Sequence, residues 1–146
     1  MIRFLLAAAR AEEPPEAPPP APPAVDAETA AAFADHLLRS GDAYGALSWY
    51  RLSDSLAPSP DIAFRIGLAY EHGERYEAAA YAYGQIPTAE AAFRAALSQH
   101  RAGGEGMADL ALSELSMLYP GSEAAQRSGY CLLYTSDAAD EVLGVG

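Results

Sequence analysis

Phe33-Ala34-Asp35-His36-Leu37 sets one small residue among bulky ones, and the arrangement returns 33 positions later as Ile66-Gly67-Leu68-Ala69-Tyr70. Ala46-x-x-x-Tyr50 is likewise repeated as Ala79-x-x-x-Tyr83, again 33 positions later. A period of this length in a sequence rich in helix-forming residues is typical of stacked helical hairpins. The sequence therefore predicts an all-α fold in which each hairpin packs on the next.

Three hairpins are expected between Asp26 and Tyr130, because apolar residues recur there at helical spacing and glycine or proline separates the segments. The sequence 103–106, with three glycines, is expected to form a turn, and Ser122 with Glu123 to begin a further helix. The first expected helix is capped by Asp26 or Thr29 and ends near Ser40. The helices expected after it are Ala43–Leu56, Asp61–His72, Tyr76–Ile86, Ala89–Ala102 and Met107–Tyr119.

Small residues are expected where the two helices of a hairpin cross, since helices packed about 8–10 Å apart need them there. These residues are Ala34, Ala46, Gly67 and Ala79. Bulky residues of the apolar stripes are expected in the core, and Tyr81, which is off the stripe, is expected in solvent. The stripes include Phe33, Tyr44, Leu47, Tyr50, Tyr83, Leu110 and Leu112.

The chain is acidic, with a formal net charge of −11 over 146 residues. Nucleic acid is not expected as a partner, because binding a phosphate backbone requires clustered Lys and Arg. Cys131 is the only cysteine, so neither an intrachain disulfide nor a cysteine metal cluster is expected. The sequence has no apolar run of about 18 residues, and no transmembrane segment is expected.

The N-terminal residues suggest export followed by a linker. Residues 1–11 are typical of a signal-peptide remnant, with Arg3 before a short apolar stretch and Ala9-Arg10-Ala11 as a cleavage pattern. This favours a periplasmic or secreted protein, with a cytoplasmic one as the alternative. Residues 12–25 hold seven of the eleven prolines and predict a disordered, extended spacer.

The C-terminal residues 131–146 are expected not to be natural protein. Cys131–Glu141 resembles, residue for residue, the translation of a transposase-type sequencing-library adapter. The alternative is a short natural tail. If the stretch derives from an adapter, the natural chain is truncated near Tyr130. The last hairpin would then lack its covering helix, expose Leu115 and Leu118, and tend to self-associate through this C-terminal face.

The repeated positions match the tetratricopeptide pattern. That pattern has a bulky residue followed by small-x-x-aromatic in the first helix, then a turn glycine, Ala-x-x-x-aromatic in the second helix and a final proline. Over residues 27–130 the chain therefore resembles the tetratricopeptide repeat (TPR) family, and residues 33–42 and 118–122 resemble bacterial envelope members of it. The matching residues of the first two hairpins are Phe33, Ala34, Leu37, Gly41, Ala46, Tyr50 and Pro58, then Ile66, Gly67, Tyr70, Tyr76, Ala79 and Tyr83. The expected turn glycine of the second hairpin, Gly73, lies one place early in this pattern.

This resemblance implies a TPR-like α-solenoid whose partner groove is lined by the first helix of each hairpin. Carried over by position, it implies the groove residues Asp35, Arg39, Phe64, Leu68, Glu71, Arg94 and Arg101. Phe64 and Leu68 would be an apolar pair in a charged groove, suited to anchoring a partner helix or peptide. The alternative is that this pair packs on a neighbouring hairpin.

Neither catalysis nor a cofactor is expected from the sequence. His36, His72 and His100 lack the spacing of metal ligands, and each is expected near the C-terminus of a first helix, where a cation is favoured. The expected function is a protein–protein interaction scaffold in the bacterial envelope. The alternatives are a non-catalytic segment of a larger enzyme or transporter, or a cytosolic chaperone-like adaptor.

Overall fold

The computed structural model describes residues 17–20 and 23–143, with the side chains described as far as residue 133. The predicted signal remnant lies outside the described residues. Those described between Ala17 and Val25 form neither helix nor strand. The described part of the chain beyond them is all-helical, as expected. Its helices are α2 (Ala27–Arg39), α3 (Ala43–Leu56), α4 (Pro60–His72), α5 (Tyr76–Gly84), α6 (Ala89–Arg101), α7 (Glu105–Leu118) and α8 (Glu123–Leu143).

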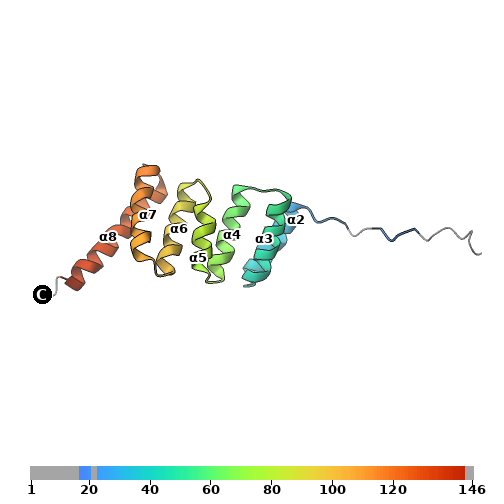
Figure 1. The fold of residues 1–146 in the computed structure, drawn as a ribbon, viewed down its shortest axis with the longest axis horizontal. Coiled ribbons are helices and arrows are strands. Elements are labelled where there is room, and N and C mark those ends of the chain that lie inside the picture. Colours follow the sequence, from blue (N-terminus) through green and yellow to red (C-terminus); the bar gives the residue numbers. More distant parts are fainter. Residues whose placement is uncertain (1–16, 21–22, 144–146) are drawn as a thin grey trace, which may run out of the picture.

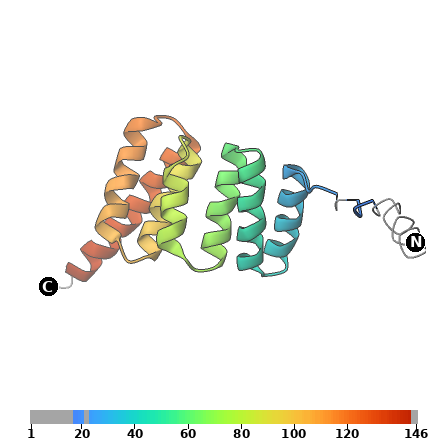
Figure 2. The same ribbon diagram turned by 45° about the vertical axis from the view of Figure 1, so that its right-hand side comes forward.

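The helices form an elongated stack in which each one packs against the next along the chain (Figures 1 and 2). Helices α2 with α3, α4 with α5, and α6 with α7 are the three hairpins. Alternate helices also meet: α2 contacts α4 and α6 contacts α8, and Arg94 and Arg101 of α6 reach Glu71 of α4. One side of the stack is therefore built from α2, α4, α6 and α8.

The turns inside the three hairpins share one geometry. The amides of Gly41 and Asp42 donate to the carbonyls of Leu38 and Leu37, which is the Schellman pattern that closes many helices. The same pair of bonds ends α4 at residues 74–75 and α6 at residues 103–104. The first residue of each pair has positive φ: Gly41 at 91°, Glu74 at 57° and Gly103 at 92°. The turn residue of the second hairpin is thus Glu74, and not Gly73 as the sequence suggested.

Side chains also fix the start of each first helix. The Asp26 carboxylate accepts from the Thr29 amide at 2.7 Å, and this bond lowers the pKa of Asp26. The hydroxyls of Ser59, Thr88 and Ser122 accept from the amide three residues further on. Pro60 occupies the first position of α4, where the missing amide hydrogen costs nothing, so α4 begins one residue earlier than expected.

Two tyrosines and small residues form the centre of the core, as predicted. Tyr50 and Tyr83 are buried, and so are Ala46 and Ala79 one turn before them. The ring of Tyr83 lies directly on Gly67. A Cβ atom at residue 67 would sit 2.5 Å from the Cε1 atom of that ring, far inside contact distance. Only glycine therefore allows α4 and α5 to approach with this ring between them.

Some expected core residues lie in solvent. Tyr44 and Leu110 are mostly exposed, and Phe33 is 44% exposed and packs edge-on against Trp49, with ring centroids 4.8 Å apart. Tyr44 and Leu110 lie on sides of α3 and α7 that no described helix covers, and Phe33 is only partly covered by α3, so helical spacing alone misassigned them. Tyr81 is exposed, as predicted.

The last helix changes the expected end of the fold. Helix α8 continues through residues 131–143, so the adapter-like sequence does not interrupt it, and the origin of that sequence stays a prediction. Leu115 is buried, contrary to expectation, because Ala124, Cys131 and Leu132 of α8 join its core cluster. Leu118 is exposed, as expected.

Two helix bounds differ from those expected. Glu105 and Gly106 lie in α7, so the turn before α7 is shorter than predicted. Helix α5 ends at Gly84, two residues early.

The turn geometry predicts that Glu74→Gly stabilises the fold. A residue with a side chain at φ 57° is strained by about 1–2 kcal/mol, and glycine avoids this strain at some cost in unfolded-chain entropy. We expect the urea midpoint to rise by the equivalent of about 0.5–1 kcal/mol at unchanged m value.

Gly41→Ala is the matched control for this prediction. A Cβ atom at residue 41 would meet nothing within 4 Å, so its cost is conformational alone. This variant should be destabilised by about 1 kcal/mol. Equal midpoints for Glu74→Gly and the wild type would contradict the turn assignment.

Candidate interaction surface

The most enclosed charge in the described part of the chain is the carboxylate of Glu71 on α4, whose side chain is 6% exposed. The hydroxyl of Tyr83 donates to its Oε2 atom at 2.6 Å. Arg101 donates to its Oε1 atom at 3.0 Å, and Arg94 lies 3.4 Å from Oε2. A buried carboxylate needs such partners, because an unpaired buried charge is strongly destabilising. Glu71 thus links α4 to its own hairpin partner, α5, and to the next hairpin, α6.

A second group of the same kind lies one hairpin earlier, around Asp35 on α2. The hydroxyl of Tyr50 donates to Asp35 Oδ1 at 2.5 Å, and Arg65 of α4 donates to Oδ2 at 2.6 Å. Arg65 also pairs with Asp61 on its own helix at 3.0 Å. Arg51 of α3 donates to the hydroxyl of Tyr70 at 2.5 Å and so adds another contact between the hairpins.

Together these bonds form a ladder along the first helices, in which an acid of one helix pairs with an arginine of the next. Asp35 pairs with Arg65, and Glu71 pairs with both arginines of α6. Arg127 of α8 pairs with Glu90 of α6 and lies over the ring of Phe93. The charges on this side of the stack are thereby largely neutralised within the chain, and α2, α4, α6 and α8 are held in one order.

The predicted groove residues fall into four groups, the last of which is the apolar pair Phe64 and Leu68. Glu71, Arg94 and Arg101 come together in one cluster, and Asp35 belongs to the neighbouring one. Arg39 is exposed near the end of α2.

Phe64 and Leu68 are half-buried against the core cluster of α5 and α6, and the ring centroids of Phe64 and Tyr83 are 5.1 Å apart. They are therefore not a free apolar pair. Their position is that of the alternative, in which the pair packs on a neighbouring hairpin. That Phe64 and Leu68 bind a partner stays a prediction.

Sequence reasoning missed the partners that complete the ladder. It singled out neither Arg65 nor the Glu90–Arg127 pair, and it treated Tyr83 only as a packing residue. The i,i+4 pairs Asp61–Arg65 and Glu90–Arg94 were the available signal, because such spacing places opposite charges on one helix face.

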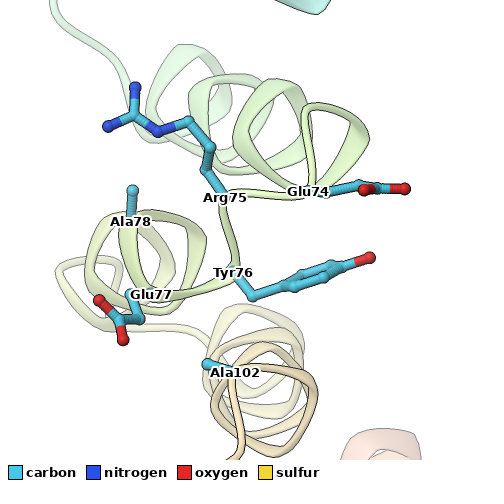
Figure 3. A pocket seen from close by; sticks show the side chains of 6 residues that line it. All are labelled: Glu74, Arg75, Tyr76, Glu77, Ala78 and Ala102. Atoms are coloured by element: carbon cyan, nitrogen blue, oxygen red, sulfur yellow. The ribbon is translucent and has the colours of Figure 1, made fainter.

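Two shallow hollows flank this ladder. One, of about 490 Å³, lies where α2, the end of α3 and the start of α4 meet, with Asp35, Arg65 and Ser53 in its wall. The other, of about 370 Å³, lies at the α4–α5 turn. Figure 3 shows Glu74, Arg75 and Tyr76 at this turn, with Ala102 from the end of α6 beside them. The guanidinium of Arg101 lies 5.7 Å from the centroid of the Tyr76 ring. Both hollows are lined by charged and small side chains.

Burial and the neighbouring carboxylates raise the pKa of both core tyrosines. For Tyr50, removal from water is the largest cause, followed by the hydrogen bond to Asp35 and its negative charge. The same three causes, with Glu71 as the acid, raise the pKa of Tyr83. For Arg65, partial burial acts to lower the pKa, but Asp35 and Asp61 raise it on balance.

Within the part of the chain that the structure describes, no helix is both long and apolar enough to cross a membrane. No group of three or more His, Cys, Asp or Glu side chains in these residues is placed to hold a metal ion. His36, His72 and His100 lie, exposed, in the last turns of α2, α4 and α6, as predicted.

No protein-family model matches the chain, and no curated protein matches it.

The raised tyrosine pKa values predict a loss of stability at alkaline pH. In the unfolded chain tyrosine ionises near pH 10, whereas the folded chain holds both protons above that pH. The two hydroxyls therefore contribute fully to the free energy of unfolding below pH 10. Their contribution falls as the pH rises further, by about 1.4 kcal/mol per pH unit for each tyrosine. Urea unfolding between about pH 9 and about pH 11.5 measures this slope.

The control variant is Tyr50→Phe/Tyr83→Phe, which keeps both rings and leaves the arginine partners of Asp35 and Glu71 in place. Its stability should fall less steeply above pH 10 than that of the wild type. Parallel curves for the two proteins would show that the fold does not raise the pKa of the two hydroxyls.

Proposed function

We propose that this chain is a TPR-like α-solenoid that binds another protein or peptide along the side formed by α2, α4, α6 and α8. The observation that supports the proposal is the ladder of ion pairs, which ties the first helix of each hairpin to the first helix of the next. A surface ordered in this way is preorganised, so a partner loses little free energy in ordering it on binding. The repeated Schellman turns and the glycine crossing at residue 67 support the same architecture independently.

The chemistry of this side favours a polar peptide or a polar helix face as the partner. The arginines of the ladder are paired within the chain, but Arg94 and Arg101 keep 37% and 52% of their side chains exposed. A partner carboxylate or carbonyl can therefore be bound at the solvent side of these guanidinium groups, which carry further donors. The residues proposed to contact the partner are Asp35, Arg39, Arg94 and Arg101, with Phe64 and Leu68 as the half-buried floor.

Site-specific photocrosslinking in bacterial cells tests this surface. A photoreactive residue at Arg39 or Arg101 should capture the same discrete protein, because both positions are exposed on first helices. The matched control replaces Tyr44, which is exposed on α3. Capture of the same protein from position 44 at equal yield, or no capture at positions 39 and 101, would contradict the proposal.

We also propose that the scaffold is exported to the bacterial envelope, on the basis of residues 1–11 and the likeness to envelope TPR proteins. Fusion of residues 1–25 to a phosphatase that is active only after export should give an active enzyme. The matched control replaces the apolar residues Phe4, Leu5 and Leu6 with Gln and should abolish activity. An inactive wild-type fusion would contradict export directed by residues 1–25.

A further inference from the structure

Helix α7 has an exposed apolar face that no described helix covers. Met107, Leu110, Met117 and Leu118 are between 61% and 76% exposed. At about 100° per residue these four positions fall within an arc of about 100°. The buried residues of the same helix, Ala108, Leu112 and Leu115, occupy a different arc, so the exposed face is not needed for packing on α6 or α8.

One end of this face opens into a hollow. The space of about 520 Å³ lies between α5 and the α6–α7 turn and is lined by Tyr81, Ala80, Gln99 and Met107, with Glu77 beside them. Tyr81 is 73% exposed, so its ring extends the apolar face of α7 towards α5. A hollow of this size beside an apolar stripe can take one large side chain of a partner as an anchor.

The charged side chains of α7 are all acids: Glu105, Asp109 and Glu114. Glu105 lies in the first turn, where the helix dipole favours an acid whatever its use. Glu114 has no such explanation. It is exposed, lies in the second half of the helix, and by helical spacing falls in the middle of the apolar arc. An apolar face with an acid at its centre and Glu77 at its end is complementary to a surface that combines apolar and cationic residues.

From this arrangement we propose that α7 is a second docking surface, which binds a basic amphipathic helix of a partner protein. Residues 107–118 span about 16 Å, enough for about three turns of a partner helix. Two of the four exposed apolar residues are methionines, whose flexible side chains adapt to different partner side chains. The binding mode is a helix laid along an apolar face, with its cations next to Glu114 and Glu77.

A second copy of the chain is a poorer occupant of this face. In a two-fold symmetric contact centred on the arc, the same patch of both copies meets, so the two Glu114 carboxylates would lie close together. Like charges in such a contact oppose association. Because α7 is the second helix of its hairpin, the proposed surface is separate from the α2–α4–α6–α8 side, and the two proposals can fail independently.

Titration with synthetic peptides tests this second surface. The probe is a helical peptide of Leu and Lys with its leucines on one face, and the comparison peptide replaces every Lys with Glu. Binding is measured by calorimetry, and the contact is mapped by amide chemical shifts. We expect the Leu/Lys peptide to shift the amides of α7 and those around Tyr81, and the Leu/Glu peptide to bind at least about tenfold more weakly.

Three variants locate the contact. Leu110→Gln/Met117→Gln should weaken binding of the Leu/Lys peptide at least about tenfold, and Glu114→Gln should weaken it by a smaller factor. The matched control is Leu56→Gln, a similarly exposed leucine on α3, which should bind as the wild type does. Equal urea midpoints of all variants would establish that the fold is unchanged.

Any of four results would overturn the proposal: no binding to the wild type, equal loss in the Leu56→Gln control, equal affinity for the acidic peptide, or a dimer that Leu110→Gln/Met117→Gln dissociates. The last result would assign the face to a second copy of the chain.

Discussion

The ring of Tyr83 resting on the backbone of Gly67 is the contact on which the rest of the structure depends. It sets how closely α4 and α5 approach, and it places the tyrosine hydroxyl inside the hairpin, beside Glu71. A side chain at residue 67 would overlap the ring, so the small residue is a steric requirement. The first hairpin meets the same requirement with Ala34 and Ala46 around Tyr50.

The buried hydroxyls extend this local packing to the whole stack. Each tyrosine donates to a carboxylate on the facing helix, and each carboxylate needs cations that its own hairpin does not supply. The following hairpin supplies them, from Arg65 in one case and from Arg94 and Arg101 in the other. The buried carboxylate of Glu71 would be left without a cation if the hairpins changed their order, and an unpaired buried charge is destabilising, so these bonds favour one order and one register of hairpins. The ion pairs on the α2–α4–α6–α8 side thus follow from the tyrosine–carboxylate bonds of the core. The apolar face of α7 takes no part in these bonds.

Much of the fold could be predicted from the sequence, because spacing determines which residues share a helix face. The hairpins, the buried Tyr50 and Tyr83 and the exposed Tyr81 follow from a period of 33 residues and from helical spacing. Spacing does not reveal which face a later helix will cover, and for that reason Phe33 and Leu110 were misassigned. The positive φ of Glu74 was missed because Gly73 next to it is the usual turn residue. The ion-pair ladder joins residues 23 to 37 positions apart, and only the packing of whole helices brings such residues together.

The most direct test of the account is the nuclear Overhauser effect between the Hα protons of Gly67 and the ring protons of Tyr83 in the isotope-labelled protein. Close packing of the ring on this backbone predicts a strong effect and an upfield ring-current shift of the Gly67 Hα resonances. If no such effect is observed and the Gly67 shifts are those of an ordinary helical glycine, α4 and α5 do not pack through this contact, and the stack is held together in some other way.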